Sequence, residues 1–333
     1  MASETAKLAM ELIRIPSVSG NEKQIGMFLA KRLKKNFDVK LQKVGTRFNV
    51  LATKGKPKVL LTTHMDTVPG NLKIREDAQW IHGRGACDTK GIISAMIVAA
   101  EEAVAQGLSD FGLLFDVSEE TDFSGIKKAV NLVNPEFVIV GEPTGLKIAF
   151  GQKGIISFKV KCKGKAAHSS MPELGESAID ELIVLLSKLK LLELPDDMEL
   201  GKTTLNIGMI NGGTKPNIIP DNAEAEIVLR ISRNSKEVMS IIQTAIPQNN
   251  IVELKCIEPI ICKDSSFDFL DLQKITVPFF SEMAFWAKKS KVVIFGPGDI
   301  RLAHSDDEKI RKKDIEKAKD LFLEIIQKLI ENK

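Results

Sequence analysis

Hydrophobic and polar residues follow two different patterns along this chain. Four short runs are predominantly apolar, at residues 58–65, 111–117, 137–140 and 292–295. Apolar residues recur at helical spacing near residues 2–14, 22–36, 90–106 and 309–331. Short apolar runs that alternate with helices are typical of strands buried on both faces of a parallel sheet. We therefore expect an α/β domain with a mainly parallel sheet and helices on both of its faces.

The middle of the chain alternates polar and apolar residues, which is the pattern of strands with one buried face. Such segments lie at residues 155–163, 204–209, 223–231 and 251–256, and helical segments lie near 176–191 and 235–246. Their order is strand, helix, strand, strand, helix, strand, as in ferredoxin-like domains. We therefore expect a large domain of residues 1–150 and 258–333, into which a smaller α+β domain, residues 151–257, is inserted.

The composition excludes several classes of protein. The 333 residues carry 47 basic and 44 acidic side chains, and 44% are apolar, which argues against a disordered chain. Aromatic residues make up only 5%, so we expect no nucleic-acid-binding surface. The apolar stretches are too short for a membrane span. The four cysteines form no CxxC pair, so we expect neither a disulfide framework nor a cysteine zinc site, and we expect a cytoplasmic protein.

Acidic and histidine side chains follow the apolar runs. In open α/β sheets, ligands bind beyond the carboxyl ends of the strands, so residues at these positions are candidates for a common site. Histidine and carboxylate side chains are also the ligands of catalytic zinc. The candidates at or just beyond the strand ends are His64, Asp66, Glu119, Glu120, Glu142 and His304. Their recurrence at four strand ends favours a metal site over unrelated loop residues.

Several acids have a simpler interpretation when each is taken alone. Asp66 can hold the second ring nitrogen of His64, since residues i and i+2 of a strand point the same way, or it can be a turn residue. Asp88, in a glycine-rich loop before a helix, can be an N-cap or a carboxylate that bridges two metal ions. Glu119 and Glu120 can be a solvated pair, or one can bind metal while the other takes a proton from water.

These motifs resemble those of the zinc-dependent aminoacylase and carboxypeptidase-G family of metallopeptidases. The resemblance spans nearly the whole chain and rests on Thr63-His64-Met65-Asp66, Gly83-Arg84-Gly85 with Asp88 and Lys90-Gly91, Glu119-Glu120, Gly141-Glu142-Pro143-Thr144, and Gly296-Pro297-Gly298-Asp299 with His304. The family includes acetylornithine deacetylases, succinyl-diaminopimelate desuccinylases and hydrolases that release lysine or ornithine from an acidic amino-group carrier protein. Its inserted ferredoxin-like lid commonly dimerises, so the resemblance implies a homodimer formed through the lid.

The resemblance also implies a metal centre with two Zn²⁺ ions per subunit, or Co²⁺ in their place. Asp88 would bridge the two ions. His64 and Glu142 would complete the ligands of one ion, and Glu120 and His304 those of the other.

Further roles follow from the same resemblance. Asp66 would orient the histidine two residues before it, and Glu119 would be the general base. His168, in the lid, would reach the active site of the partner subunit and stabilise the oxyanion, although a loop histidine without a catalytic role stays an alternative. Arg230 would grip a substrate carboxylate and Asn217 would be a second lid contact with the substrate.

The expected activity is a di-zinc amidohydrolase that releases lysine or ornithine from an N-acylated or carrier-protein-linked precursor, in lysine and arginine biosynthesis. The shortness of the chain and the Gly-Pro-Gly-Asp loop favour the carrier-protein hydrolases. An N-acetylornithine or N-acetyl-lysine deacetylase is the close alternative, and a dipeptidase or aminopeptidase on the same metal site is a third. A non-catalytic binding module is disfavoured, because every expected ligand and the base are present.

Overall fold

The computed structural model describes residues 3–331, and its contacts divide the chain into two compact units. The first unit comprises the chain up to Gly151, the segment Ile261–Ile275 and the chain from Ser281 onward. The second comprises Gln152–Ile260 and the short segment Thr276–Phe280. Residue 2, where the first expected helix begins, lies outside the described residues, as do residues 1, 332 and 333 of the expected large domain.

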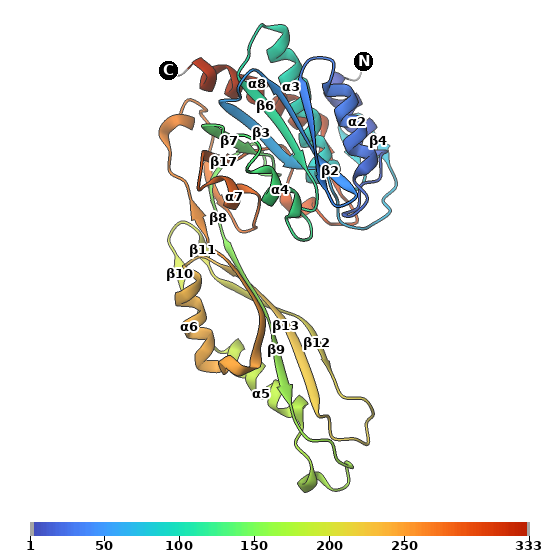
Figure 1. Ribbon diagram of the computed structural model, residues 1–333, viewed down its shortest axis with the longest axis vertical. Coiled ribbons are helices and arrows are strands. Elements are labelled where there is room, and N and C mark those ends of the chain that lie inside the picture. The colour runs from blue at the N-terminus through green and yellow to red at the C-terminus, as the bar shows by residue number, and fades with distance from the viewer. Residues whose placement is uncertain (1–2, 332–333) are drawn as a thin grey trace. The chain divides into compact units, whose positions relative to one another are not determined.

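A nine-stranded sheet forms the centre of the first unit (Figure 1). The main strand order is β1 (Asp38–Val44), β2 (Arg47–Lys54), β6 (Phe111–Asp116), β3 (Val59–His64), β7 (Phe137–Val140), β17 (Lys291–Ile294), β8 (Ile148–Gln152) and β15 (Ile260–Ile261), and β16 (Lys274–Val277) pairs with β8. The four central strands, β6, β3, β7 and β17, are parallel, whereas β1, β2 and β8 pair antiparallel. The carboxyl ends of the four parallel strands therefore meet at one edge.

Helices cover both faces of this sheet. One face packs against α1 (Glu4–Ile13), α2 (Lys23–Leu33), α3 (Gly91–Ala105) and α8 (Lys312–Glu331), which share one hydrophobic core with the sheet. The other face carries the short helices α4 (Ser124–Ala129) and α7 (Met283–Trp286). Helix α3 is buried along most of its length, because its alanines let it lie between the sheet and the helices α1 and α8. No helix in the described part of the chain is both long and apolar enough to cross a bilayer.

A small three-stranded sheet lies beside the main one and joins distant parts of the chain. It consists of β4 (Arg75–Glu76), β5 (Trp80–His82) and β18 (Lys309–Arg311), with β5 in the middle. The pairing of β18 with β5 brings the segment after His304 next to the glycine-rich loop that follows β5. A π-helical turn, Ala86–Lys90, leads from that loop into α3, and 3₁₀ turns lie at Pro172–Leu174, Gln248–Asn250, Ser265–Phe267 and Ile300–Leu302.

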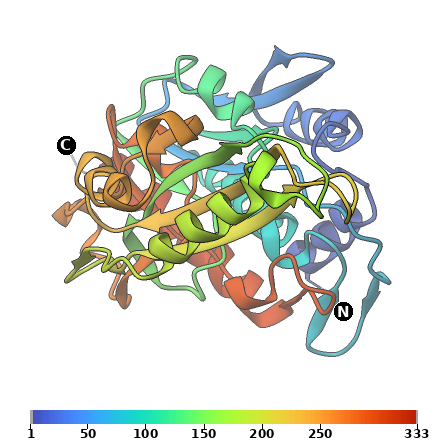
Figure 2. The same ribbon diagram turned by 90° about the horizontal axis from the view of Figure 1, so that it is seen from below.

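The second unit has a four-stranded antiparallel sheet in the order β12-β13-β9-β14. Its elements along the chain are β9 (Gly154–Lys163), α5 (Ala178–Lys190), β12 (Thr204–Gly212), β13 (Asn222–Ile231), α6 (Ser235–Ala245) and β14 (Ile251–Ile257), with a small hairpin of β10 (Asp196–Asp197) and β11 (Gly201–Lys202). Alternate residues of β9 and β13 are buried under α5 and α6, and Figure 2 shows α5 lying along the strands. This is the expected ferredoxin-like order.

The structure confirms the expected fold class, an α/β domain with an inserted α+β domain, and corrects it in one respect. The main sheet is mixed, because the hairpin β1–β2 and the strand β8 add antiparallel ladders on both sides of the parallel centre. Strand β1 was not expected because it lies at the sheet edge with mostly exposed residues, so its sequence has no apolar run.

Candidate active site

The carboxyl edge of the parallel strands collects the candidate residues of the first unit. His64 is the last residue of β3, Glu119 follows β6 by three positions, and Glu142 follows β7 by two. Asp88 arrives from the turn that precedes α3, and His304 follows the 3₁₀ turn after β17. Separate segments of the chain thus converge at one edge, which is where the strand order predicts a ligand site.

Asp88 lies between the two histidines of this cluster. Its Oδ1 is 3.0 Å from Nε2 of His64, and its Oδ2 is 3.3 Å from Nε2 of His304. Glu142 Oε1 lies 4.0 Å from Nε2 of His64, and Glu120 Oε1 lies 2.9 Å from Nε2 of His304. The cluster therefore has two halves, each with one histidine and one glutamate, and the two halves share one carboxylate.

The side chains of this cluster are suited to bind a divalent cation. Ligand atoms of His64, Asp88 and Glu120 all lie within 4.8 Å of one another. Imidazole nitrogens and carboxylate oxygens are the donors that catalytic zinc uses, and cobalt or manganese accept the same set. The side chain of Asp88 is 7% exposed and that of His304 is 50% exposed, so the cluster is buried on one side and open on the other. A catalytic metal site needs such an open side for substrate.

The ring of His64 is oriented by its neighbour Asp66, although chiefly through the main chain. Nδ1 of His64 lies 3.0 Å from the main-chain oxygen of Asp66 and 3.6 Å from its Oδ1. Because a carbonyl oxygen only accepts, Nδ1 carries the proton and Nε2 is left for a metal ion. The Asp66 carboxylate also accepts the main-chain N–H groups of Glu119 and Glu120, at 3.1 and 3.2 Å. Asp66 thereby ties β3 to the turn that carries both glutamates.

Carboxylates dominate the electrostatics of the site. Hydrogen bonds with Asp88 and Glu120 raise the pKa of His304 to about 10. Burial opposes the charge on His64, but hydrogen bonds with neighbouring carboxylates raise its pKa well above the usual value. Burial, with the negative charge of Glu120 added, raises the pKa of Glu119 well above its usual range despite the attraction of His64. The cluster attracts positive charge, as a cation site must.

The remaining candidates, His168, Asn217 and Arg230, lie in the second unit. The loops that carry His168 and Asn217 are joined, because the Ser169 N–H donates to the Asn217 carbonyl at 3.1 Å and His168 forms a β-bridge with Ile218. Nδ1 of His168 accepts the main-chain N–H of Ser170 at 3.2 Å. In the neutral ring Nε2 must then carry the proton, so His168 can donate a hydrogen bond from Nε2. Arg230 is half-buried on β13, opposite Ile155 of β9.

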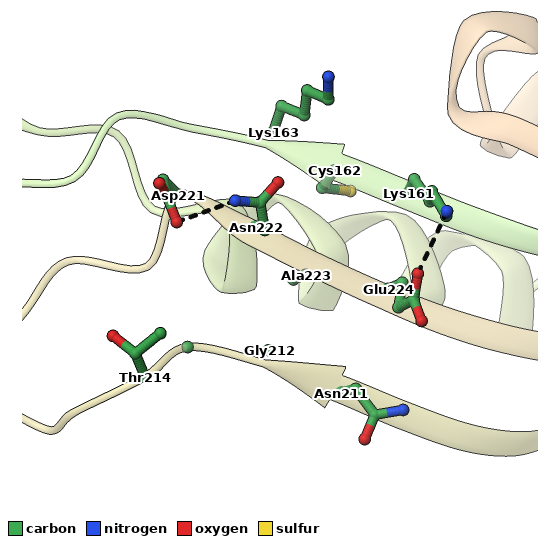
Figure 3. A pocket seen from close by; sticks show the side chains of 11 residues that line it. Lys161, Cys162, Lys163, Asn211, Gly212, Thr214, Asp221, Asn222, Ala223 and Glu224 are labelled. Carbon is green, nitrogen blue, oxygen red and sulfur yellow. Dashed lines mark hydrogen bonds and ion pairs between the residues drawn. The ribbon is translucent and has the colours of Figure 1, made fainter.

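The second unit also has a pocket of about 370 Å³ between the ends of β9, β12 and β13. Figure 3 shows Lys161 and Glu224 facing each other across β9 and β13, with their charged atoms 3.5 Å apart. Asn222 donates to Asp221 at its rim. None of the three lid candidates lines this pocket. Its mixed charges give it no preference for a ligand of one sign.

Comparisons with known proteins place this geometry in a family. Residues 150–251 match the model of the peptidase dimerisation domain. A Peptidase M20 domain-containing protein of Schizosaccharomyces pombe is 36% identical over 315 residues, which cover 90% of this chain and 78% of that protein. A protein of Emericella nidulans named probable carboxypeptidase is 33% identical and aligns with 99% of this chain and 90% of its own length. The chain belongs to the M20 peptidase family.

Solved structures agree with this assignment at the level of the fold. A tripeptidase from Staphylococcus aureus superposes with a TM-score of 0.82 at 23% identity, over 99% of both chains. A Bacillus subtilis protein described as a dinuclear metal-binding peptidase of the M20 family superposes with a TM-score of 0.69 at 16% identity, over 98% of this chain and 97% of its own. The expected resemblance to a metallopeptidase family, and the expectation of a hydrolase acting on amide bonds, are thus confirmed.

Sequence reasoning on this M20 chain overlooked two pairs of residues around the cluster. Arg84 and Glu308 form a buried ion pair, with 2.6 Å between Nη1 and Oε2. Asp116, at the end of β6, and Glu282, at the start of α7, are both fully buried. Arg84 stands between two glycines of the motif loop, but a lone acid such as Glu308 in a charged segment carries no signal of burial. Only the pairing of β18 with β5 reveals its place.

Proposed function

We propose that this chain is a two-metal hydrolase that cleaves the amide bond of short peptides or N-acylated amino acids. The observation that supports this proposal most is Asp88, whose two carboxylate oxygens each face a different histidine. A carboxylate that serves as an N-cap alone has no need of two histidine partners. His64, Asp88 and Glu142 would hold one cation, and Asp88, Glu120 and His304 would hold the other.

Glu119 is the proposed general base. When bound, the two cations polarise the substrate carbonyl and lower the pKa of a water molecule. The carboxylate of Glu119 takes a proton from that water and passes it to the leaving amine. The position of Glu119 directly before Glu120, at the carboxyl end of β6, supports this assignment. Asp66 holds the main chain of Glu119 in place and keeps the His64 ring oriented.

The lid supplies the proposed contacts with the substrate. His168 has an Nε2 proton to donate to the oxyanion that forms on the substrate carbonyl. Asn217 lies on the adjoining loop, where its amide can contact the substrate. Arg230 would bind a substrate carboxylate, which matches a substrate that ends in a free amino acid. The names of the relatives, carboxypeptidase and tripeptidase, support substrates of this kind.

Release of lysine or ornithine from an N-acyl or carrier-linked precursor is a narrower candidate. It is favoured by the loop Gly296-Pro297-Gly298-Asp299 before His304, which resembles that of the deacetylase and carrier-hydrolase branches. The acidic carrier protein would then be a macromolecular partner. The small net charge of +3 offers it little electrostatic attraction, so we rank short peptides and free N-acyl amino acids first.

A homodimer formed through the second unit is part of the proposal. The matched dimerisation domain supports it, and so do exposed apolar side chains on two neighbouring elements of that unit. Ile183 and Val184 on α5 are 57% and 51% exposed, and Met209 and Ile210 on β12 are 53% and 62% exposed. Apolar side chains that gather on an exposed surface mark protein contacts.

A substrate panel tests the proposed function. The zinc-loaded and cobalt-loaded protein is assayed with dipeptides, tripeptides, N-acetylornithine, N-acetyl-lysine and a carrier-linked lysine. Turnover of the short peptides or acetylated amino acids, abolished by a chelator and restored by metal, is the expected result. Exclusive turnover of the carrier-linked amino acid would favour the narrower candidate. A metal-loaded protein that hydrolyses no member of the panel would contradict both.

A further inference from the structure

Glu308 is a buried acid that the proposed chemistry does not use. It lies four residues after His304, directly before β18, and is 1% exposed. Burying a carboxylate away from water is costly unless the charge is paired and its oxygens are hydrogen-bonded. Its contacts therefore indicate what the acid does in the fold.

The hydrogen bonds of the Glu308 side chain lead to the loop before α3. Oε1 accepts the main-chain N–H groups of Cys87 and Asp88, at 3.1 and 3.2 Å. Oε2 accepts a hydrogen bond of 2.6 Å from Nη1 of Arg84. The main chain takes part as well, since the Gly83 N–H donates to the Glu308 carbonyl at 3.1 Å. One acid thus binds both ends of the segment that carries Asp88.

Arg84 connects this loop to the second histidine. Its Nη1 also donates to the main-chain oxygen of Ser305 at 3.3 Å, and Ser305 is the residue after His304. His304 itself has a φ of 60°, in the left-handed region that non-glycine residues seldom adopt, so its backbone has to be held in place. Arg84 and Glu308 together therefore join the loop of Asp88 to the loop of His304.

The loop of Asp88 needs such support. Gly85 has a φ of 81°, and the backbone angles of Asp88 are −125° and 91°, outside the helical region although the residue lies within a helical turn. Its N–H lies in the first turn, where the N–H groups of a helix have no partner within the helix, and Glu308 accepts it. Without this acceptor, the loop would have to leave a buried N–H unsatisfied or move.

We propose that Glu308, with Arg84 as its counter-charge, is a positioning residue that sets the separation of Asp88 and His304, and with it the affinity of the second cation. The inference rests on the proposed roles of Asp88 and His304 as metal ligands. The cation held by Asp88, Glu120 and His304 depends on both loops that the pair joins. The cation held by His64, Asp88 and Glu142 depends on only one of them, so its affinity should change less.

The test measures metal binding rather than turnover. Chelator-treated protein is titrated with Co²⁺, and bound metal is followed by calorimetry and by the visible absorption of the cobalt, for the native chain, Glu308→Gln and Arg84→Lys. Outer contacts of metal ligands typically contribute 10–100-fold to metal affinity. We expect the second equivalent to bind about 10–100-fold more weakly in Glu308→Gln, while the first stays within a few-fold of native. Arg84→Lys should show the same pattern with a smaller change.

A matched control separates this role from a general loss of stability. Arg32 and Glu101 form a different ion pair in the first unit, between α2 and α3, with two hydrogen bonds of 2.9 and 2.7 Å. Glu101→Gln should leave both metal affinities unchanged. An equal weakening in Glu101→Gln, or native affinity for the second equivalent in folded Glu308→Gln and Arg84→Lys, would overturn the inference.

The same titration distinguishes failure of the inference from failure of the proposed function. A native chain that binds fewer than two equivalents contradicts the two-metal proposal itself. A native chain that binds two, with Glu308→Gln binding two equally well, contradicts only the role of Glu308. If thermal unfolding shows that Glu308→Gln does not fold, the result for Arg84→Lys decides, because lysine keeps the positive charge but loses the second contact with Ser305.

Discussion

At the residue scale, Asp88 is the centre of the site. Its oxygens are divided between His64 and His304, and its main chain is held by Glu308. Burial opposes its charge, but hydrogen bonds with the two histidines lower its pKa below the usual range of an aspartate. Because both its side chain and its main chain make these contacts, we expect substitutions of Asp88 to be poorly tolerated.

The first prediction concerns the metal content of ligand variants. Asp88→Asn should lose most of both cations, because the amide lacks the charge that both halves of the cluster share. His304→Ala and Glu120→Ala should lose one equivalent each. Elemental analysis after dialysis against a metal buffer measures this, with Glu101→Gln as the control. Two equivalents retained in all three variants would show that the ligands lie elsewhere.

The second prediction separates the base from the ligands. Glu119→Gln leaves the size of the side chain nearly unchanged and alters none of the proposed metal ligands. The fold and the two metal equivalents should therefore be retained. Loss of the proton acceptor should lower kcat by about 10²–10⁴-fold, the usual contribution of a general base. Steady-state kinetics on the metal-loaded variant give the answer. Turnover at the native rate with full metal content would remove Glu119 from the mechanism.

At the element scale, the sequence was sufficient to predict the buried strands but not the strand at the edge of the sheet. The strands β3, β6, β7 and β17 are apolar on both faces, and this is why their runs could be recognised. The lid strands could be recognised by alternation, since β9 and β13 have one buried face. The edge strand β1 and the helix α7 were not predicted. The residues of β1 are mostly exposed, and the apolar run of α7 is only four residues long, too short to distinguish a helix from a strand.

Side-chain contacts between elements were harder still to foresee. The strand ends identified His64 and Glu142, because topology alone brings them to one edge. Arg84 and Glu308 meet only because β18 pairs with β5, two strands of three residues each that carry no sequence pattern. Short pairings of this kind depend on the finished tertiary structure.

A third prediction arises where β6 ends beside α7. Burial, with the charge of Glu282 added, raises the pKa of Asp116 well above its usual range. A carboxyl group whose pKa is higher in the folded state than in the unfolded state stabilises the protein at low pH. This stabilisation is lost as the pH rises through the pKa of the folded state. Asp116→Asn, which cannot ionise, should therefore be more stable than the native chain in the metal-free protein at pH 8, where ionisation of the buried native acid is unfavourable.

Urea unfolding of the native chain and of Asp116→Asn at pH 4.5, 6 and 8 tests which of the two is more stable at each pH. The stability difference between Asp116→Asn and the native chain should shrink toward zero at the lowest pH, where the native acid is also neutral. Asp38→Asn is a control, because this acid is exposed at the start of the edge strand β1 and lies outside the buried acid pair. A variant less stable than native at pH 8 would mean that the ionised form of Asp116 is the one the fold requires.

At the scale of the whole molecule, the fourth prediction concerns two copies of the chain. If the lids form the dimer and His168 serves the partner's site, then His168→Ala should lower kcat while metal content stays native. One oxyanion donor is worth about 2.7–4 kcal/mol, or roughly 10²–10³-fold in rate. Mixed dimers of His168→Ala and Glu119→Gln then contain one site with both residues intact.

Activity should partly return when these two inactive variants are mixed and subunit exchange is verified. The maximum recovery is one intact site per mixed dimer. A mixture of His168→Ala with the double variant His168→Ala, Glu119→Gln is the control, because none of its sites is complete. Exchange without recovery would mean that His168 acts within its own chain or has no part in the reaction.

The insertion of one unit into the other also has a consequence for biosynthesis. His64, Asp88, Glu120 and Glu142 precede the inserted residues, whereas His304 and Glu308 follow them. While the ribosome is still translating the lid, the nascent chain has all three proposed ligands of one cation, but it lacks His304, one of the three proposed for the other. The residues of β17, β18 and α8 have not yet been translated at that stage. A chain that ends between the lid and His304 therefore lacks both part of the proposed site and part of the core that positions it.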